Sequence, residues 1–223
     1  MLLTAFAIVV ALYGFIELAL EMGEGEMRHF DEWLLRLLRR ENDLAVPIGP
    51  PWLSGALTDI TALGGTAVLV GVILVTIGYL ALQHRYGATA LVIIASAGGG
   101  LLSVALKQVF ARTRPDIVPH LVLVEGHSFP SGHSMAAAVI YLTLGALLAR
   151  FAARRRVRIY VIGVSLVLTA LIGITRVYLG VHYPSDVLAG WAAGLAWALV
   201  CWLAARYLQY RGAVEAPGSS AAR

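Results

Sequence analysis

The sequence predicts an all-α integral membrane protein: a bundle of six transmembrane helices with one further amphipathic helix at the membrane interface. Two observations predict this fold class. Of the 223 residues, 59% are hydrophobic and 13% are charged, whereas soluble domains average about 25% charged residues. The mean hydropathy is +0.79, and the apolar residues gather into six runs close to the roughly 20 residues that a spanning helix needs.

The six runs cover residues 2–20, 60–82, 86–106, 134–149, 159–175 and 187–205. Glu17 is the only acidic or basic side chain inside them. We expect the first run to be a retained helix rather than a signal peptide. It has no basic start, its apolar run exceeds the usual 7–15 residues or so, and no clear cleavage site follows it.

The segments outside the runs complete the predicted organisation. Residues 27–40 alternate apolar and charged side chains at helical spacing, which suits a helix lying in the outer interface and equally a surface helix packed on the bundle. We expect one six-span domain over residues 1–211 and a disordered cytoplasmic tail over 212–223, because the tail is small and polar. The single cysteine, Cys201, excludes an internal disulfide framework and a Cys-rich metal site.

Basic residues predict the orientation of the bundle. The connection between the fourth and fifth runs carries five arginines: Arg150, Arg154, Arg155, Arg156 and Arg158. Cytoplasmic loops concentrate Lys and Arg, so this side and both termini are expected in the cytoplasm. Because the arginines border membrane spans, lipid headgroups explain them, and no nucleic-acid partner is expected.

Three polar clusters fall at the outer ends of the last four runs. They are KQVFARTRP at 107–115, FPSGHS at 129–134 and TRVYLGVHYPSD at 175–186. Forty-two residues separate His133 from Arg176. At about 1.5 Å per helical residue this is roughly 63 Å, or two crossings of a core about 30 Å thick. All three clusters are therefore expected on one extracytoplasmic face.

These clusters suit the binding of a phosphate group. Lys107, Arg114 and Arg176 place three cations around one spot, as a multiply charged anion requires. The PSGH segment opens a helix, where free N–H groups also attract anions, and Gly132 permits close approach of the backbone to the ligand. Taken singly, the basic residues could equally extend from helix ends to the headgroups.

The same clusters hold groups for phosphoryl transfer. His182 can attack phosphorus as a neutral imidazole, Asp186 can hold the proton of its other nitrogen, and His133 can protonate the leaving oxygen. Arg176 and Asp186 could instead form a structural ion pair, and His120 and His127 are interpreted as loop residues. No metal-ligand set accompanies these residues, so we expect metal-independent chemistry without a cofactor.

Together the motifs K-x6-RP, PSGH and R-x5-H-x3-D resemble the three-part signature of the type 2 phosphatidic acid phosphatase superfamily. One departure is Thr175, where the third motif usually begins with serine. The resemblance implies a six-helix membrane phosphatase that dephosphorylates lipids at the extracytoplasmic surface. It also implies residue roles: a nucleophile that forms phosphohistidine (His182), its orienting carboxylate (Asp186), a general acid (His133), and a phosphate site made by Lys107, Arg114, Ser131, Gly132 and Arg176.

The lipid substrate stays open at this point. Bacterial members of the superfamily act on undecaprenyl pyrophosphate, phosphatidylglycerol phosphate and phosphatidic acid, and we favour undecaprenyl pyrophosphate or a broad range of lipid phosphates. The alternative is a transporter or flippase that binds a phospholipid headgroup without hydrolysis, although it would not need two histidines and an aspartate. Vanadium haloperoxidases belong to the same superfamily but are soluble, and the six predicted spans argue against that function. The oligomeric state is not predicted.

Overall fold

The computed structural model describes residues 1–211, and the predicted tail lies outside the described residues. In this range the chain forms eight helices and one small sheet. The helices and strands are α1 (Leu2–Glu24), α2 (Arg28–Leu37), β1 (Arg39–Arg40), β2 (Asp43–Pro47), α3 (Pro51–Ala62), α4 (Thr66–Leu82), α5 (Tyr86–Phe110), α6 (Gly132–Phe151), α7 (Arg155–Tyr178) and α8 (Pro184–Tyr210).

The predicted membrane bundle is confirmed, with one difference in its second span. Helices α1, α5, α6, α7 and α8 are each long and apolar enough to cross a membrane. The predicted second span corresponds to α3 and α4, which meet at an angle of 42° and reach spanning length only when they are taken together. The sequence predicted one helix over 60–82, but the helix breaks at Leu63–Gly65 because two consecutive glycines, Gly64 and Gly65, weaken helical structure.

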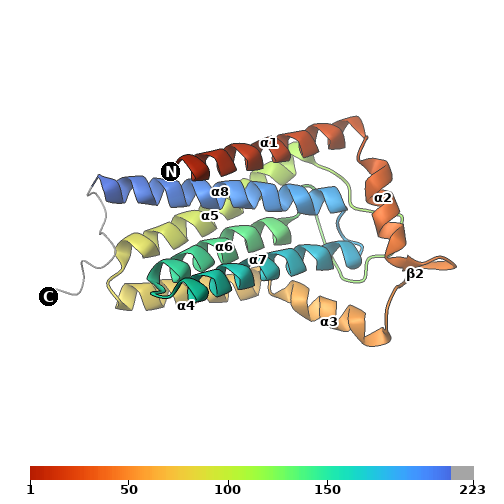
Figure 1. Cartoon of the computed structure of the whole chain (residues 1–223). Helices are drawn as coiled ribbons and strands as arrows, with labels where there is room; N and C mark the ends of the chain where they lie inside the picture. Colours follow the sequence, from red (N-terminus) through yellow and green to blue (C-terminus); the bar gives the residue numbers. More distant parts are fainter. Residues whose placement is uncertain (212–223) are drawn as a thin grey trace.

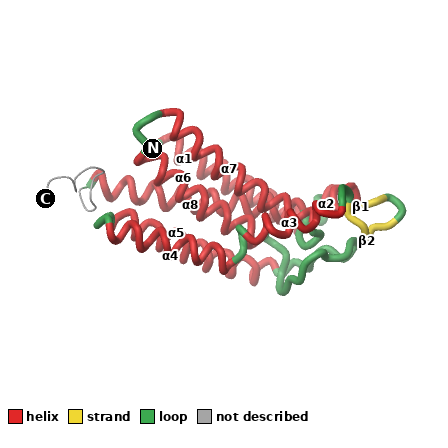
Figure 2. Tube along the Cα trace, turned by 90° about the horizontal axis from the view of Figure 1, so that it is seen from below, coloured by secondary structure: helices red, strands yellow, loops and turns green. Residues whose placement is uncertain are grey.

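Helix α6 lies at the centre of the bundle, packed against α5, α7 and α8 (Figures 1 and 2). Gly190 on α8 permits a close approach to α6, since a Cβ atom there would lie 2.7 Å from the carbonyl oxygen of Ser131. The start of α8 therefore packs directly on the start of α6. This contact brings the second and third sequence motifs together.

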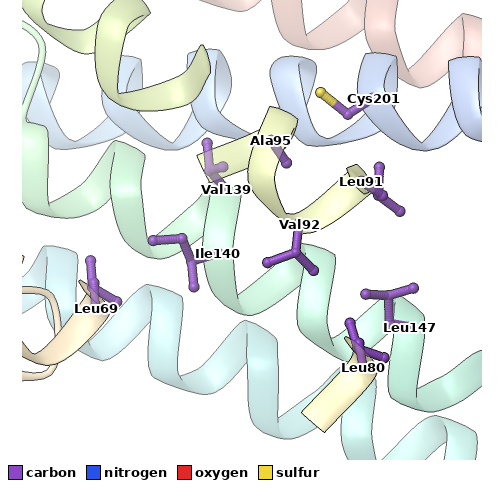
Figure 3. Packing of buried hydrophobic residues seen from close by; sticks show 9 residues of the cluster. All are labelled: Leu69, Leu80, Leu91, Val92, Ala95, Val139, Ile140, Leu147 and Cys201. Carbon is purple, nitrogen blue, oxygen red and sulfur yellow. The ribbon is translucent and has the colours of Figure 1, made fainter. Parts of the chain in front are cut away.

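An apolar cluster fixes the helices along the rest of the bundle (Figure 3). Helices α4, α5, α6 and α8 contribute to it. Its members are Leu69, Leu80, Leu91, Val92, Ala95, Val139, Ile140, Leu147 and Cys201. Because interiors of this kind are closely packed, the cluster holds the helix ends that carry the motifs in a defined arrangement.

Helix α2 crosses one end of the bundle and is followed by a short hairpin (Figure 1). The sequence predicted helix over 27–40, but α2 ends at Leu37, and Arg39–Arg40 pairs with Asp43–Pro47 as an antiparallel ladder. Arg39 is buried and donates to the carbonyl oxygen of Tyr178 at 2.9 Å, which holds the chain against the end of α7. Apolar side chains of α2 such as Trp33 remain exposed, as an interfacial helix requires.

Candidate active site

Residues of all three motifs line one cavity, and the helix ends that carry them lie at the end of the bundle with α2 and the hairpin (Figure 1). Helix α5 ends there, α6 and α8 begin there, and the connection 111–131 crosses that end. The cavity has a volume of about 440 Å³. Six of the eight predicted site residues line it: Lys107, Arg114, Gly132, His133, Arg176 and His182.

The other two predicted residues, Ser131 and Asp186, are completely buried and do not line the cavity. The Ser131 amide donates to the carbonyl oxygen of Asp186 at 2.9 Å, which ties α6 to α8. The Ser131 hydroxyl accepts from the amide and the hydroxyl of Ser134, at 3.4 and 2.9 Å, and so caps α6. A phosphate contact by the Ser131 side chain therefore stays a prediction.

Gly132 is the first residue of α6 and faces the cavity. A Cβ atom at this position would lie 3.4 Å from Cε of Lys107, so the lysine side chain passes close over the glycine. The first N–H groups of a helix have no partner within the helix. A cation and a helix N-terminus, which both attract anions, are thus combined in one wall of the cavity.

His182 lies between a carboxylate on one side and a cation on the other. Its Nδ1 atom is 3.3 Å from the Ser128 hydroxyl and 3.4 Å from Oδ2 of Asp186. The same Oδ2 accepts from the Ser128 hydroxyl and from the Tyr183 amide, the latter at 2.9 Å. The Nε2 atom lies 3.3 Å from Nη1 of Arg114. These contacts favour the tautomer that carries its proton on Nδ1 and leaves a lone pair on Nε2.

Burial determines the charge of His182. The ring is 2% exposed, and loss of hydration lowers its pKa to about 4, against the opposing effect of its hydrogen bond to Asp186. A pKa of about 4 leaves the imidazole neutral at pH 7. A neutral imidazole with a free lone pair is the form that can act as a nucleophile.

Two of the cations around the cavity are held by backbone carbonyl groups. Nζ of Lys107 donates to the carbonyl oxygen of His127 at 2.6 Å. Burial lowers the pKa of Arg114, although an arginine keeps its charge in proteins. The carbonyl oxygens that accept from Arg114 belong to Glu125 (2.8 Å), Gly126 (3.0 Å) and Val181 (2.8 Å).

The third cation, Arg176, is almost fully buried. Its Nη1 atom donates to the hydroxyl of Thr61 at 3.1 Å, and its Nε atom has no partner in the described part of the chain. Over residues 1–211, none of the three cavity cations forms an ion pair with a carboxylate. Asp186 pairs with Arg112 instead of Arg176, so the considered ion pair between Arg176 and Asp186 is wrong. The cavity therefore carries positive charge that an anionic ligand can neutralise.

Comparison with known proteins identifies the family of this chain. The family model described as the PAP2 superfamily matches residues 86–210, which contain all three motifs. The chain belongs to the PAP2 superfamily. This confirms the resemblance found in the sequence, and it assigns the motifs to a region that covers more than half of the chain.

The PAP2 relatives are named as phosphatases. Phosphatidylglycerophosphatase B of Bacillus subtilis is 37% identical over 154 residues, which are 68% of this chain and 74% of the relative. Lipid A 1-phosphatase of Rhizobium etli is 40% identical over 104 residues, 43% of this chain and 40% of the relative. The crystal structure of a transmembrane PAP2 type phosphatidylglycerolphosphate phosphatase from Bacillus subtilis matches with a TM-score of 0.81 and 30% identity, over 91% of this chain and 98% of that one. The chain is accordingly a multi-pass membrane lipid phosphatase, as predicted.

The PAP2 site also contains residues that the sequence analysis did not assign. Ser128 contacts both His182 and Asp186, and Thr61 supports Arg176 from α3. A lone Ser or Thr outside the motifs gives no signal in one sequence. His127, interpreted as a loop residue, lies in the connection 111–131 and lines the cavity. Arg112 was visible within the first cluster, but its charge could not be distinguished from that of an arginine at a helix end.

Proposed function

We propose that the chain hydrolyses a phosphate monoester or pyrophosphate of a membrane lipid, without a metal ion, through a phosphohistidine on His182. The arrangement around His182 carries this proposal. Its Nδ1 atom faces Ser128 and Asp186, while Nε2 lies beside Arg114 in a cavity whose cations form no ion pairs with carboxylates of residues 1–211. A nucleophile, its orienting group and a site for the transferred group are thus adjacent.

In the first step the lone pair on Nε2 of His182 forms an N–P bond, and the bond from phosphorus to the leaving oxygen breaks. His133, which lines the same cavity, donates a proton to that oxygen. The imidazole becomes positively charged, and Asp186 stabilises this charge through Nδ1. In the second step water attacks phosphorus, His133 accepts its proton, the N–P bond breaks, and inorganic phosphate leaves.

Phosphoryl transfer depends mainly on positioning and on neutralising the charge of the phosphoryl oxygens. Lys107, Arg114 and Arg176 supply this charge, together with the free N–H groups at the start of α6. Fixed cations take the place that Mg²⁺ occupies in many other phosphoryl-transfer enzymes. The proposal of a metal-independent reaction rests on the presence of these three fixed cations.

The substrate class follows from the relatives. The match to Phosphatidylglycerophosphatase B covers 74% of that relative, and it supports a lipid phosphate monoester such as phosphatidylglycerophosphate as the first substrate to test. The match to Lipid A 1-phosphatase covers 40% of its length and supports a phosphorylated glycolipid less strongly. Undecaprenyl pyrophosphate is the lipid pyrophosphate to test beside these monoesters.

The test is release of inorganic phosphate by the purified protein in detergent from phosphatidylglycerophosphate, undecaprenyl pyrophosphate and phosphatidic acid. We expect release from at least one lipid, and its loss by a factor of about 10³ or more in His182→Ala and His133→Ala. His29→Ala is the matched control, because His29 is an exposed residue of α2. Release that persists in His182→Ala would overturn the proposed nucleophile.

Two further measurements test the chemistry. Activity should persist in EDTA, and loss on chelation with recovery on adding a divalent ion would contradict a metal-independent reaction. Rapid acid-free quenching with a lipid labelled in its transferred phosphate should leave label on the wild-type protein and none on His182→Ala. A labelled carboxylate or serine would point to a different nucleophile.

A further inference from the structure

Helix α2 places one carboxylate, that of Asp31, beside the residues that hold Asp186 against His182. Asp31, in the first turn of α2, is completely buried. It accepts from the amide of Ser185 at 2.9 Å, from the Ser185 hydroxyl at 2.5 Å and from Nη2 of Arg112 at 2.8 Å. The neighbouring Glu32 is partly exposed and, in the described part of the chain, pairs only with Arg28 and Arg36 of its own helix. Buried carboxylates are costly unless they are paired, and Asp31 meets this condition through Arg112 and Ser185.

Arg112 connects Asp31 to Asp186. Its Nη2 atom binds Asp31, and its Nη1 atom donates to Oδ1 of Asp186 at 2.6 Å. The guanidinium group also lies over the ring of Tyr183, 4.2 Å from the ring centre. The rigid fork of an arginine can hold two carboxylates in fixed positions. With Oδ1 held by Arg112, Oδ2 of Asp186 is left to face His182.

We propose that Asp31 is a positioning residue for the reaction: it holds Arg112, and through Arg112 it fixes both the orientation and the effective charge of Asp186. This inference rests on the proposed role of His182 as the nucleophile. Asp31, Arg112 and Asp186 together carry one net negative charge. That charge stabilises the positive charge that develops on the imidazole during attack. Without the Asp31 carboxylate, Arg112 neutralises Asp186, and the stabilisation of the attacking imidazole is weakened.

The proposal separates a catalytic effect from simple attachment of α2 to the bundle. No hydrogen bond or ion pair links Asp31 or Arg112 to Lys107, Arg114 or Arg176 within residues 1–211. Loss of Asp31 should therefore reduce kcat and leave KM nearly unchanged, which is the sign of an interaction made in the transition state. A residue that only anchors α2 would change the amount of folded protein and its thermal stability, while the folded fraction would keep the wild-type kcat.

The experiment compares Asp31→Asn with Glu32→Gln in the full chain, using the lipid on which the wild type is most active. We expect kcat of Asp31→Asn to fall about 10- to 100-fold with KM changed by less than about threefold. Glu32→Gln should behave as the wild type. Phosphate release by the wild type tests the proposed function separately. A wild-type kcat in folded Asp31→Asn would therefore overturn only the role of Asp31.

A double-mutant cycle keeps the test informative if Asp31→Asn is unstable. The variant Asp31→Asn/Arg112→Gln removes both charges, so no unbalanced Arg112 charge remains in the buried cluster. If Asp31 acts through Arg112, the double variant should have a kcat no lower than that of Arg112→Gln alone. If the reduction of kcat in the double variant equals the product of the reductions in the two single variants, the residues act independently and the proposal is overturned.

Discussion

The two nitrogen atoms of His182 have different environments, and the burial of the ring sets the pH range in which this proposed nucleophile is neutral. Nδ1 faces Asp186 and Ser128, and Nε2 lies beside Arg114. Burial lowers the pKa of His182 to about 4, whereas an ordinary histidine titrates near 6.5. The nucleophilic neutral form is therefore present at neutral pH and is lost only as the pH falls through about 4.

We predict that the acid limb of kcat/KM lies near pH 4 rather than near 6.5, because kcat/KM reports ionisation of the free enzyme. The measurement is kcat/KM against pH in detergent, corrected for the substrate phosphate, whose second ionisation falls near pH 6. An acid limb that stays near pH 6.5 after this correction would show that His182 titrates as an ordinary histidine. In that case burial would not control the nucleophile.

At the residue scale, the sequence predicted those site members that lie within spaced motifs. His133 and His182 could be assigned because each stands at a fixed distance from glycine, arginine or aspartate in a polar segment beside an apolar run. Asp31 could not be assigned, since it occurs among the charged residues of an amphipathic helix and resembles a solvent-exposed side chain. Its burial results from the donors of Ser185 and Arg112, which only the tertiary structure brings to it.

At the element scale, the break between α3 and α4 forms part of the site. Thr61 at the end of α3 supports Arg176, and Gly64 in the break packs against His133. A Cβ atom on Gly64 would lie 3.3 Å from Cδ2 of His133 and 2.5 Å from Cγ2 of Ile172. The sequence showed one apolar run here, because hydropathy reports membrane insertion and is insensitive to a bend within the span.

We predict that Gly64→Ala lowers kcat several-fold, because the added methyl group overlaps Ile172 and crowds the ring of His133, and both side chains must shift from their positions. A displacement of about 1 Å can reduce a rate by up to about 10²-fold. The matched control is Gly71→Ala in α4, where a Cβ atom would have no neighbour within 4 Å. Phosphate release should be measured for both at equal folded protein. Equal kcat values would mean that the position of His133 does not depend on this break.

At the scale of the whole molecule, the fold class was predictable because it depends on chain-wide properties. Apolar runs of spanning length outweigh local irregularities, so the bundle was expected even though the bounds of individual helices differ. The end of α2 depends on tertiary contacts such as the hydrogen bond from Arg39 to Tyr178, and hydropathy does not report them. The sequence therefore predicts the fold class better than the bounds of the individual helices.

The two ends of the bundle differ in charge and function, and this asymmetry predicts the orientation. The cavity lies at the end that carries α2, while the start of α1, the end of α8 and the α6–α7 connection lie at the opposite end (Figure 1). Arg154 lies in that connection, and Arg155 and Arg156 are the first two residues of α7. Arginine-rich short loops remain in the cytoplasm, so we predict cytoplasmic termini and a cavity on the extracytoplasmic side.

Reporter fusions to the chain in cells test this orientation. A fluorescent protein that matures only in the cytoplasm should fluoresce at the C-terminus, and a phosphatase reporter active only outside should be inactive there. The same reporters fused after residue 125, within the connection 111–131 beside the cavity, should give the opposite pattern. If the outside reporter were active at the C-terminus, the cavity would open to the cytoplasm, and its lipid substrate would have to come from the inner leaflet.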